Sequence, residues 1–236
     1  MTILFVIPQL SAGGDLSSQS IAFSRYIASL EQGSPFAESG PFAVLIEASI
    51  PALYKESALV AVRQTGNNER SEFLIVGMGG DGAVVGEVIA RYFTIVEQME
   101  SLPGSSTLIT PENYKFRFRG EVKTGTGAAY VYDIMPRKRH RGLFKGQIWI
   151  DSGTGAELLV SGRLTDAFSG TDRITFVRET KLDASGYVRV THLSFAVPLL
   201  GQSELSVEER PLGLTEMPIP QGLPQIDGRR GSGERY

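Results

Sequence analysis

Hydrophobic and polar side chains alternate through the stretch from Tyr114 to Asp151, which is typical of β-strands with one buried face. Turn residues at 124–127 and a basic stretch at 137–141 divide it into three predicted strands. Since alternate positions on neighbouring strands meet on the same side of a sheet, their apolar members are expected to form one continuous surface. The residues predicted to line that surface are Phe116, Phe118, Tyr130, Tyr132, Phe144, Ile148 and Ile150.

Helical periodicity occurs in two segments before this stretch. Apolar residues between Ile21 and Leu30 recur at three-to-four spacing and stop at Gly33, so a short amphipathic helix is predicted there. The same spacing from Val84 to Met99 predicts the principal helix. Alternating or turn-bounded segments predict further strands near 42–50, 58–64, 72–76, 157–164, 172–182, 187–197 and 202–209.

The order of these elements defines the expected fold class. Strands follow one another in a run rather than alternating with helices, which indicates an α+β protein with a mainly antiparallel sheet. We expect one domain over residues 16–210, with the Val84–Met99 helix packed on the apolar face of the sheet. Residues 1–15 are predicted to be a clipped signal segment or an apolar arm. Residues 211–236, rich in proline, glycine and arginine, are predicted to be a disordered tail.

Composition limits the classes of function. With 42% hydrophobic residues among 236, the chain can bury a substantial core as one domain. A formal net charge of −3 gives no electrostatic reason to expect nucleic acid as a partner. The absence of cysteine excludes disulfides, thiolate zinc sites and a cysteine nucleophile.

The beginning of the sequence bears on localisation. The apolar run Ile3–Ile7 is followed by Pro8 and the small residues Ser11 and Ala12, which resembles the end of a secretory signal, although no lysine or arginine precedes it. A start codon assigned too late would remove the basic segment, so we expect export to the periplasm. An arm or first strand packed on the domain is the alternative interpretation. No other run is long enough to cross a bilayer, and no integral membrane span is expected.

A glycine-rich motif, Gly79-Gly80-Asp81-Gly82-Ala83, follows the predicted strand at 72–76. It resembles the Gly-Gly-Asp-Gly-Thr loop of NAD kinases and diacylglycerol kinases, in which glycine amides approach phosphates. Ala83 stands where that loop has threonine, and no parallel strand-helix-strand pattern precedes it. Glycine and aspartate also make good local turns, which is the favoured interpretation. A nucleotide-binding, kinase-like enzyme acting through Gly79–Gly82 remains an alternative function.

Other candidate chemistry is sparse. The basic run Arg137–Arg141 could bind phosphate groups or an acidic membrane surface, but a solvated hairpin loop is favoured. His140 and His192 are far apart, with no carboxylates gathered around them to complete a metal site. Trp149 falls on the opposite face from its neighbours and is expected to pack under a helix. We therefore expect no enzyme, no catalytic residue, no metal and no cofactor.

A group of short motifs between residues 136 and 163 carries a family resemblance. These are Pro136-Arg137-Lys138, the strand from Gly142 to Asp151 that ends Gly-Gln-Ile-Trp-Ile-Asp, the turn Thr154-Gly155, and Leu158–Arg163. They resemble the core of outer-membrane lipoprotein-sorting-like (LolA/RseB-like) envelope proteins. The resemblance implies a strongly bent antiparallel sheet, forming an open half-barrel covered by one long and one or more short helices. The lid helix and gating arginine of the sorting carriers match no position here.

The resemblance and the apolar surface together lead to a functional prediction. We expect an envelope protein that binds or carries a lipid or lipoprotein acyl chain on the seven-residue surface, with the Val84–Met99 helix as its cover. Each buried methylene contributes about 0.8 kcal/mol, so a long chain could be held without polar contacts. The expected partner is a lipid or acylated lipoprotein, with an envelope protein as a further candidate. The alternative is a sensor or scaffold with a self-filled core, working through exposed Lys115, Arg117 and Arg119.

Overall fold

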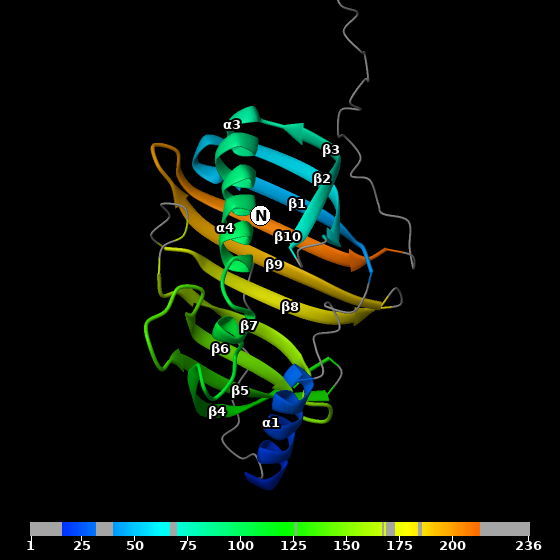
Figure 1. The fold of residues 1–236 in the computed structure, drawn as a ribbon, viewed down its shortest axis with the longest axis vertical. Helices are drawn as coiled ribbons and strands as arrows, with labels where there is room; N and C mark the ends of the chain where they lie inside the picture. Colours follow the sequence, from blue (N-terminus) through cyan, green and yellow to red (C-terminus); the bar gives the residue numbers. More distant parts are fainter. Residues whose placement is uncertain are drawn as a thin grey trace, which may run out of the picture.

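The computed structural model describes residues 16–31, 40–66, 70–125, 127–166, 168, 173–183 and 186–212. Within them, ten strands form one sheet in the order β3-β2-β1-β10-β9-β8-β7-β6-β5-β4, and every neighbouring pair is antiparallel. The sheet is open, with β3 and β4 as its two edges, and it curves into a half-barrel with helices on its concave face (Figure 1). The predicted α+β class with a curved antiparallel sheet is confirmed.

The strands lie close to their predicted positions. They are β1 (Phe42–Ile50), β2 (Lys55–Thr65), β3 (Ser71–Gly80), β4 (Tyr114–Thr124), β5 (Gly127–Pro136), β6 (Phe144–Asp151), β7 (Glu157–Leu164), β8 (Thr175–Asp183), β9 (Gly186–Val197) and β10 (Gly201–Pro211). The helices are α1 (Leu16–Glu31), the one-turn η1 (Pro51–Leu53), α3 (Gly82–Val84), the π-helical η2 (Val85–Ile89), α4 (Ala90–Glu100) and α5 (Gly104–Thr107).

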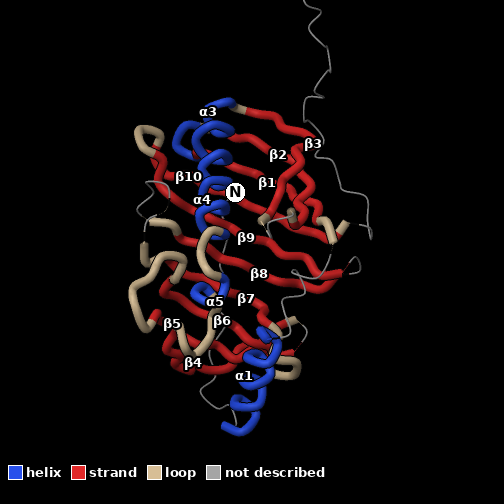
Figure 2. The backbone as a smooth tube through the Cα atoms, viewed as in Figure 1, coloured by secondary structure: helices blue, strands red, loops and turns tan. Residues whose placement is uncertain are grey.

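The chain order explains how the helices come to lie on the sheet. Strands β4 to β10 form a meander, and β10 then pairs with β1, so the first three strands extend the sheet beyond its last strand. Because β3 and β4 are at opposite edges, the helical segment between them must cross the concave face (Figure 2). Residues 82–100 span about 28 Å as a helix, whereas the two edge strands are about 43 Å apart along the sheet. The principal helix therefore covers only the part nearest β3.

The first of two apolar cores lies beneath this helix. We call it the α4 core; its buried helical members are Val84, Val88, Ile89 and Ile95. They pack against β1, β2, β9 and β10, and the most buried strand residues include Val44, Ile46, Leu59 and Phe195. The adjacent residues Val88 and Ile89 both face the sheet, as the wider π-helical turn permits.

The second core lies beneath α1 at the other end of the sheet. We call it the α1 core; its buried members are Ala22, Tyr26, Ile109, Tyr114, Tyr130, Tyr132, Ile134, Leu143, Phe144, Ile148, Ile150 and Val160. Phe23, Ile27 and Leu30 of α1 pack against it. The prediction that the Val84–Met99 helix covers the seven lining residues is wrong. That helix reaches only the β3 side of the sheet, and α1 packs over the lining residues instead.

The outer face of the sheet carries a smaller cluster. Val122, Ala129 and Val131 are buried there, and Trp149 and Leu158 pack against them. Trp149 thus lies in an apolar patch of the convex face. The prediction that it packs under a helix is wrong. A break in the β4–β5 register between Phe118 and Gly120 moves Val122 to this face.

Two predictions fall partly or wholly outside the described residues. These are the clipped signal or arm at 1–15 and the tail at 211–236, of which only Pro211 and Leu212 are described. The sheet itself extends over Phe42–Pro211, close to the end of the predicted domain. Among the described helices, none has the length and apolar character needed to cross a membrane.

Candidate functional site

The structure brings the seven predicted lining residues together on one surface. All belong to the α1 core, and five of them, on β5 and β6, are buried. Phe116 and Phe118 on β4 are partly buried at the edge of the sheet. Phe118 makes edge-to-face contacts with Tyr130 and Tyr132, at centroid separations of 6.0 and 5.6 Å. The prediction of a continuous apolar surface agrees with this packing.

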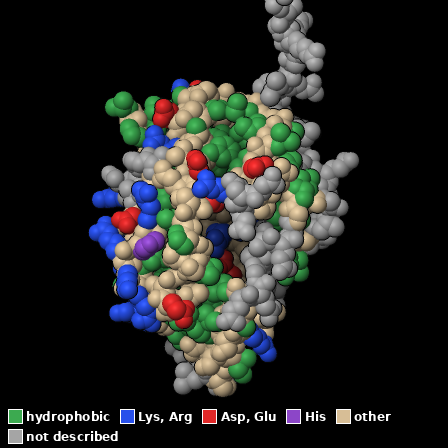
Figure 3. All heavy atoms as spheres, in the orientation of Figure 1, with side chains coloured by type: hydrophobic (Ala, Val, Ile, Leu, Met, Phe, Trp, Pro, Cys, Tyr) green, Lys and Arg blue, Asp and Glu red, His purple; other side chains and the backbone are tan. Residues whose placement is uncertain are grey.

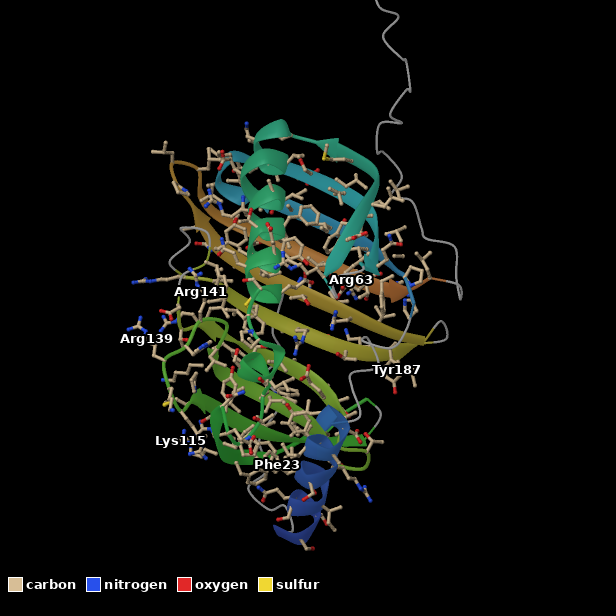
Figure 4. The ribbon with its side chains drawn as sticks, viewed as in Figure 1. Phe23, Arg63, Lys115, Arg139, Arg141 and Tyr187 are labelled. Carbon is tan, nitrogen blue, oxygen red and sulfur yellow. The ribbon has the colours of Figure 1, made fainter. Side chains whose placement is uncertain are left out.

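Helix α1 fills that surface with its own side chains. The ring of Phe23 lies 4.9 Å from Phe116 and 5.4 Å from Tyr132 between centroids, where α1 meets β4 and β5 (Figure 4). Tyr26 is fully buried, and its hydroxyl donates a hydrogen bond to the Ile109 carbonyl at 3.0 Å. Burial raises the pKa of the Tyr26 phenol well above its ordinary value, so this residue is neutral throughout the usual pH range.

The turn between β6 and β7 holds α1 in place. The Asp151 carboxylate accepts hydrogen bonds from the backbone amides of Gly153 and Thr154, at 3.0 and 2.7 Å. Gly155 follows with φ +78°, and its α-carbon lies directly against the helix. A β-carbon there would be 2.5 Å from Cβ of Arg25 and 2.8 Å from N of Tyr26. The Asp and Thr-Gly positions of the sequence motif therefore form the docking turn for α1.

A close glycine pair also belongs to this motif. Gly146 of β6 and Gly162 of β7 are cross-strand partners on the concave face. A β-carbon on Gly146 would lie 1.8 Å from the Ser161 carbonyl oxygen, and one on Gly162 would lie 2.6 Å from Cδ2 of Phe144. The missing side chains let the strands approach and allow the Phe144 ring to lie across Gly162, where it contacts Phe176 at 4.9 Å between centroids.

A group of charged side chains, absent from the sequence prediction, lies between the two cores. We call it the charged band; its members are Arg63, Glu157, Arg178, Arg189 and Glu209. Glu209 binds Nε of Arg63 at 2.9 Å and Nε of Arg189 at 2.7 Å, and its side chain is 11% exposed. Burial alone would raise the pKa of Glu209, but the charges and hydrogen bonds of Arg189 and Arg63 outweigh it and hold this pKa below its usual value.

The rest of the band lies closer to α1. Arg178 of β8 donates from Nη2 to Glu157 of β7 at 2.8 Å, and the Nε of Arg178 is buried without a hydrogen-bond partner. The charge of Glu157 raises the pKa of Arg178, so the guanidinium stays protonated. Figure 3 shows a hollow on this face between α4 and α1, with positive and negative side chains at its floor. Figure 4 labels Arg63 at the β2 end of the band.

The sequence does contain a weak signal for this band. Glu209 continues the alternation of the buried Leu205 and Val207, so a charged residue stands at an inward-facing position. Arg178 likewise follows the inward-facing Phe176 by two residues. A charge at a core position requires a partner, but strand order is needed to identify it.

The residues of the Gly79–Gly82 motif form the turn between β3 and the helix that follows it. Gly79 and Gly80 end β3, an edge strand antiparallel to β2, and a β-carbon on Gly80 would lie 2.5 Å from the Glu56 carbonyl oxygen. The Asp81 side chain accepts from the amide of Ala83 at 2.9 Å and pairs with Lys55 at 3.1 Å. The hydrogen bond to Lys55 and the helix-start amides lower the pKa of Asp81. These contacts are those of a turn that caps a helix.

The basic run and the histidines are exposed. Residues 137–141 lie in the loop between β5 and β6, and Arg139 pairs with Asp166 at 3.5 Å. Arg139, Arg141 and Lys115 lie along one flank of the molecule (Figure 4). His140 is in this loop and His192 is on β9, and the described part of the chain contains no cluster of potential metal ligands.

Comparisons with known proteins give similarity only to solved structures. No protein-family model and no curated protein matches the chain. A LolA superfamily protein from Nitrosomonas europaea matches with a TM-score of 0.34 and 12% identity, over 85% of this chain and 94% of that one. MucB in complex with MucA(peri) matches with a TM-score of 0.23 and 12% identity, over 83% and 94%. The Pseudomonas aeruginosa MucA/MucB complex matches with a TM-score of 0.26 and 13% identity, over 82% of this chain and 95% of that one.

These matches include a LolA superfamily protein, the group that the residues between Pro136 and Arg163 resemble. TM-scores of this size mean that the chains superpose poorly in detail. The matches therefore assign no ligand, partner or residue role to this protein.

Proposed function

We propose that this protein is a non-enzymatic envelope protein that binds the acyl chain of a lipid or lipoprotein on the apolar surface beneath α1. The observation that carries the proposal is the way α1 is attached to that surface. Its described contacts include side-chain packing, single hydrogen bonds from Tyr26 and Arg25, and one between Gln19 and Tyr132, while the strands are joined by continuous ladders. The helix can therefore leave without breaking any strand pairing, and an apolar chain can replace it.

The energies of the two occupants are comparable. Burying Phe23, Tyr26, Ile27 and Leu30 contributes about 1.5–3 kcal/mol each, or about 6–12 kcal/mol in all, as an upper range for partly buried side chains. A chain of about 14 methylenes contributes about 11 kcal/mol at about 0.8 kcal/mol per methylene. A long acyl chain thus has the apolar area needed to exchange with α1, whereas a short one does not.

A fluorescent fatty-acid displacement assay tests the proposal. The folded wild type is expected to bind the probe saturably, and Phe118→Trp is expected to weaken binding about tenfold, or about 1.4 kcal/mol, by overfilling the surface. Lys115→Trp is the matched control, because it places the same ring on the exposed side of the same strand. A folded wild type that binds no fatty acid would contradict the proposal.

That negative result would favour the alternative, in which α1 is permanent core and the protein is an envelope sensor or scaffold. The favouring observation is that α1 already fills the surface. Exposed Lys115, Arg117 and Arg119 on the β4 edge would then be available to an envelope protein partner, although Arg117 and Arg119 both pair with Asp133. The test of this alternative is whether an envelope protein co-purifies with the wild type. That protein should no longer co-purify with Lys115→Glu.

The same proposal places the protein in the periplasm. It is supported by the apolar Ile3–Ile7 run ending in small residues, and by the resemblance of residues 136–163 to envelope proteins. Fractionation of the cells tests this. We expect release of the protein with the periplasmic contents. Recovery of the protein in the cytosolic fraction would refute this localisation.

A further inference from the structure

Connections between paired strands come together at one end of the sheet, which we call the loop end. The turn from β1 to β2 (51–54), the turn from β9 to β10 (198–200) and the connection from β5 to β6 (137–143) lie there, as does the one from β7 to β8. The pairing of Ser49 with Glu204, for example, places the end of β1 beside the start of β10. Strands lie about 4.8 Å apart, so successive connections are about 10 Å apart and the row extends about 29 Å. In Figure 1 these connections form the left side of the sheet.

Two neighbouring turns of the loop end carry exposed apolar side chains. Leu199 of the β9–β10 turn is fully exposed, Tyr54 of the β1–β2 turn is 97% exposed, and Leu53 beside it is 43% exposed. The two turns are adjacent, because η1 contacts β10. None of these three side chains belongs to the α4 core, the α1 core or the cluster on the convex face. Their apolar surface therefore contributes nothing to the packing of the sheet.

The backbone at these tips is also unfavourable for the residues it carries. Tyr54 has φ 53° and Leu199 has φ 67°, and they are the two non-glycine residues with positive φ in the described part of the chain. In this conformation the β-carbon of an L-residue crowds the following carbonyl oxygen, so folding favours glycine there. Because neither side chain packs against the cores, no contact there offsets the strain. Strained positions of this kind cluster at functional sites, and we infer that these two side chains are kept for binding.

The same end of the sheet is basic. Its β5–β6 connection carries four exposed cations: Arg137, Lys138, Arg139 and Arg141. Asp166 pairs with Arg139 at 3.5 Å, and Glu112 interacts with the charge of Arg137. Two carboxylates therefore face four cations, and the connection keeps an excess of positive charge. Figure 4 labels Arg139 and Arg141 on this flank of the molecule.

The acidic residues near the apolar tips do not cancel this excess. Asp81 pairs with Lys55 at 3.1 Å, while Glu56 and Glu204 lie within strands β2 and β10. The two turns themselves, 51–54 and 198–200, contain no charged residue. Figure 3 shows hydrophobic side chains projecting at the upper end of this flank, with Lys and Arg side chains below them. Apolar tips and a basic loop thus share one end of the protein.

This combination fits a lipid bilayer better than a folded partner. A protein interface has a closely packed core, whereas these tips are single side chains on separate turns. A bilayer accepts such protrusions because its apolar phase is deformable, and tyrosine is enriched at the depth of the headgroups. Lysine and arginine beside the tips are attracted to acidic headgroups. Stable association with a membrane takes two such contributions together.

We propose that the loop end docks the protein on the surface of an anionic lipid bilayer. Tyr54 and Leu199 insert below the headgroups, and the basic connection 137–141 lies against them. This surface is separate from the acyl-chain site beneath α1, and the proposal does not depend on that site.

Co-sedimentation with vesicles tests the proposal. The full chain is mixed with vesicles of phosphatidylcholine alone, or of phosphatidylcholine and phosphatidylglycerol in equal parts. We expect about tenfold tighter binding to the anionic vesicles, and loss of that difference at high salt. Leu199→Gly should weaken binding about tenfold, as the loss of one inserted leucine implies. Its melting temperature should stay the same or rise, because glycine relieves the positive φ.

Matched variants at the opposite end of the sheet are the controls. Leu182→Ser removes a leucine that is 71% exposed next to the β8–β9 connection, and should leave vesicle binding unchanged. Lys138→Gln should weaken binding to anionic vesicles about fivefold, as one charge near the surface implies. Lys123→Gln, an exposed lysine at the other end of β4, should not. Every variant keeps residues 1–15, so any effect of the apolar Ile3–Ile7 run is common to all of them.

Three results would overturn the proposal. These are a wild type that binds neither kind of vesicle, Leu199→Gly binding as tightly as the wild type, and Leu182→Ser binding as weakly as Leu199→Gly. If the wild type binds no vesicle but sediments as a dimer that Leu199→Gly abolishes, the tips contact a second copy of the chain, and the bilayer is the wrong partner. Fatty-acid displacement is measured without vesicles, so failure of the docking surface leaves the proposed function standing.

Discussion

Replacing Gly155 with alanine is expected to detach α1 from the sheet. The residue has φ +78°, where an L-side chain costs about 1–2 kcal/mol. The added β-carbon would also lie 2.5 Å from Cβ of Arg25 and 2.8 Å from N of Tyr26, within the helix itself. Overpacking of this kind adds about 1–3 kcal/mol, and the contact is relieved when α1 moves away.

Hydrogen exchange measures where the damage falls. In Gly155→Ala the amides of α1 should lose protection while β5 and β6 retain it, and the protein should bind more of a neutral apolar probe. Gly201→Ala is the matched control: its φ is +94°, but a β-carbon there has no atom within 4 Å. It should lose about 1–2 kcal/mol of stability without exposing α1. Equal α1 protection in the two variants would mean that the turn does not hold the helix.

Removing Glu209 is expected to have the largest effect on global stability. Its carboxylate bonds Arg63 and Arg189 at 2.9 and 2.7 Å with a side chain only 11% exposed. Glu209→Ala leaves two guanidinium groups facing each other in a largely buried position, which costs about 3–5 kcal/mol. Urea unfolding provides the measurement. Glu208→Ala is the control, because Glu208 points to the other face of the sheet. It pairs there with Arg210, and both side chains are about a third exposed. This variant should change stability by about 0–1 kcal/mol.

The same carboxylate gives a pH dependence of defined sign. The pKa of Glu209 is depressed in the folded state, so its contribution is fully present above the unfolded value of about 4.3. It is lost as the pH falls through the lower folded pKa. The stability difference between wild type and Glu209→Gln should be constant above about pH 5 and shrink below it. A difference that persists unchanged at strongly acidic pH would argue against charge pairing in the band.

Neutral tyrosines set a different limit on pH effects. Burial raises the pKa of Tyr114 to about 12, and its hydroxyl accepts a hydrogen bond from the Phe144 amide at 3.3 Å. Burial likewise raises the pKa of Tyr26 above the normal range. Neither Tyr26 nor Tyr114 of the α1 core therefore titrates near neutral pH. Changes in ligand binding between pH 6 and 9, where neither these two phenols nor Arg178 titrates, would have to come from the ligand or from other groups.

The sequence by itself determined the strands and the surface they share. Period-two alternation is a local property, because successive side chains of any strand point to opposite faces. Positions such as Phe118, Tyr132 and Ile148 could therefore be assigned to one face, and short connections made their strands neighbours. The helices at 16–31 and 82–100 were recoverable for the same reason, since three-to-four spacing is local as well.

Only the tertiary structure decided which helix covers that surface and which charges meet. The cover depends on strand order: the pairing of β10 with β1 moves β3 to the far edge and carries α4 away from Phe118 and Tyr132. The charged band joins Arg63 to Glu209 through β1 and β10, strands whose adjacency no local pattern encodes. The alternation of buried and exposed positions along β10 predicts that Glu209 points inward. Its partners are set by contacts between residues far apart in the chain.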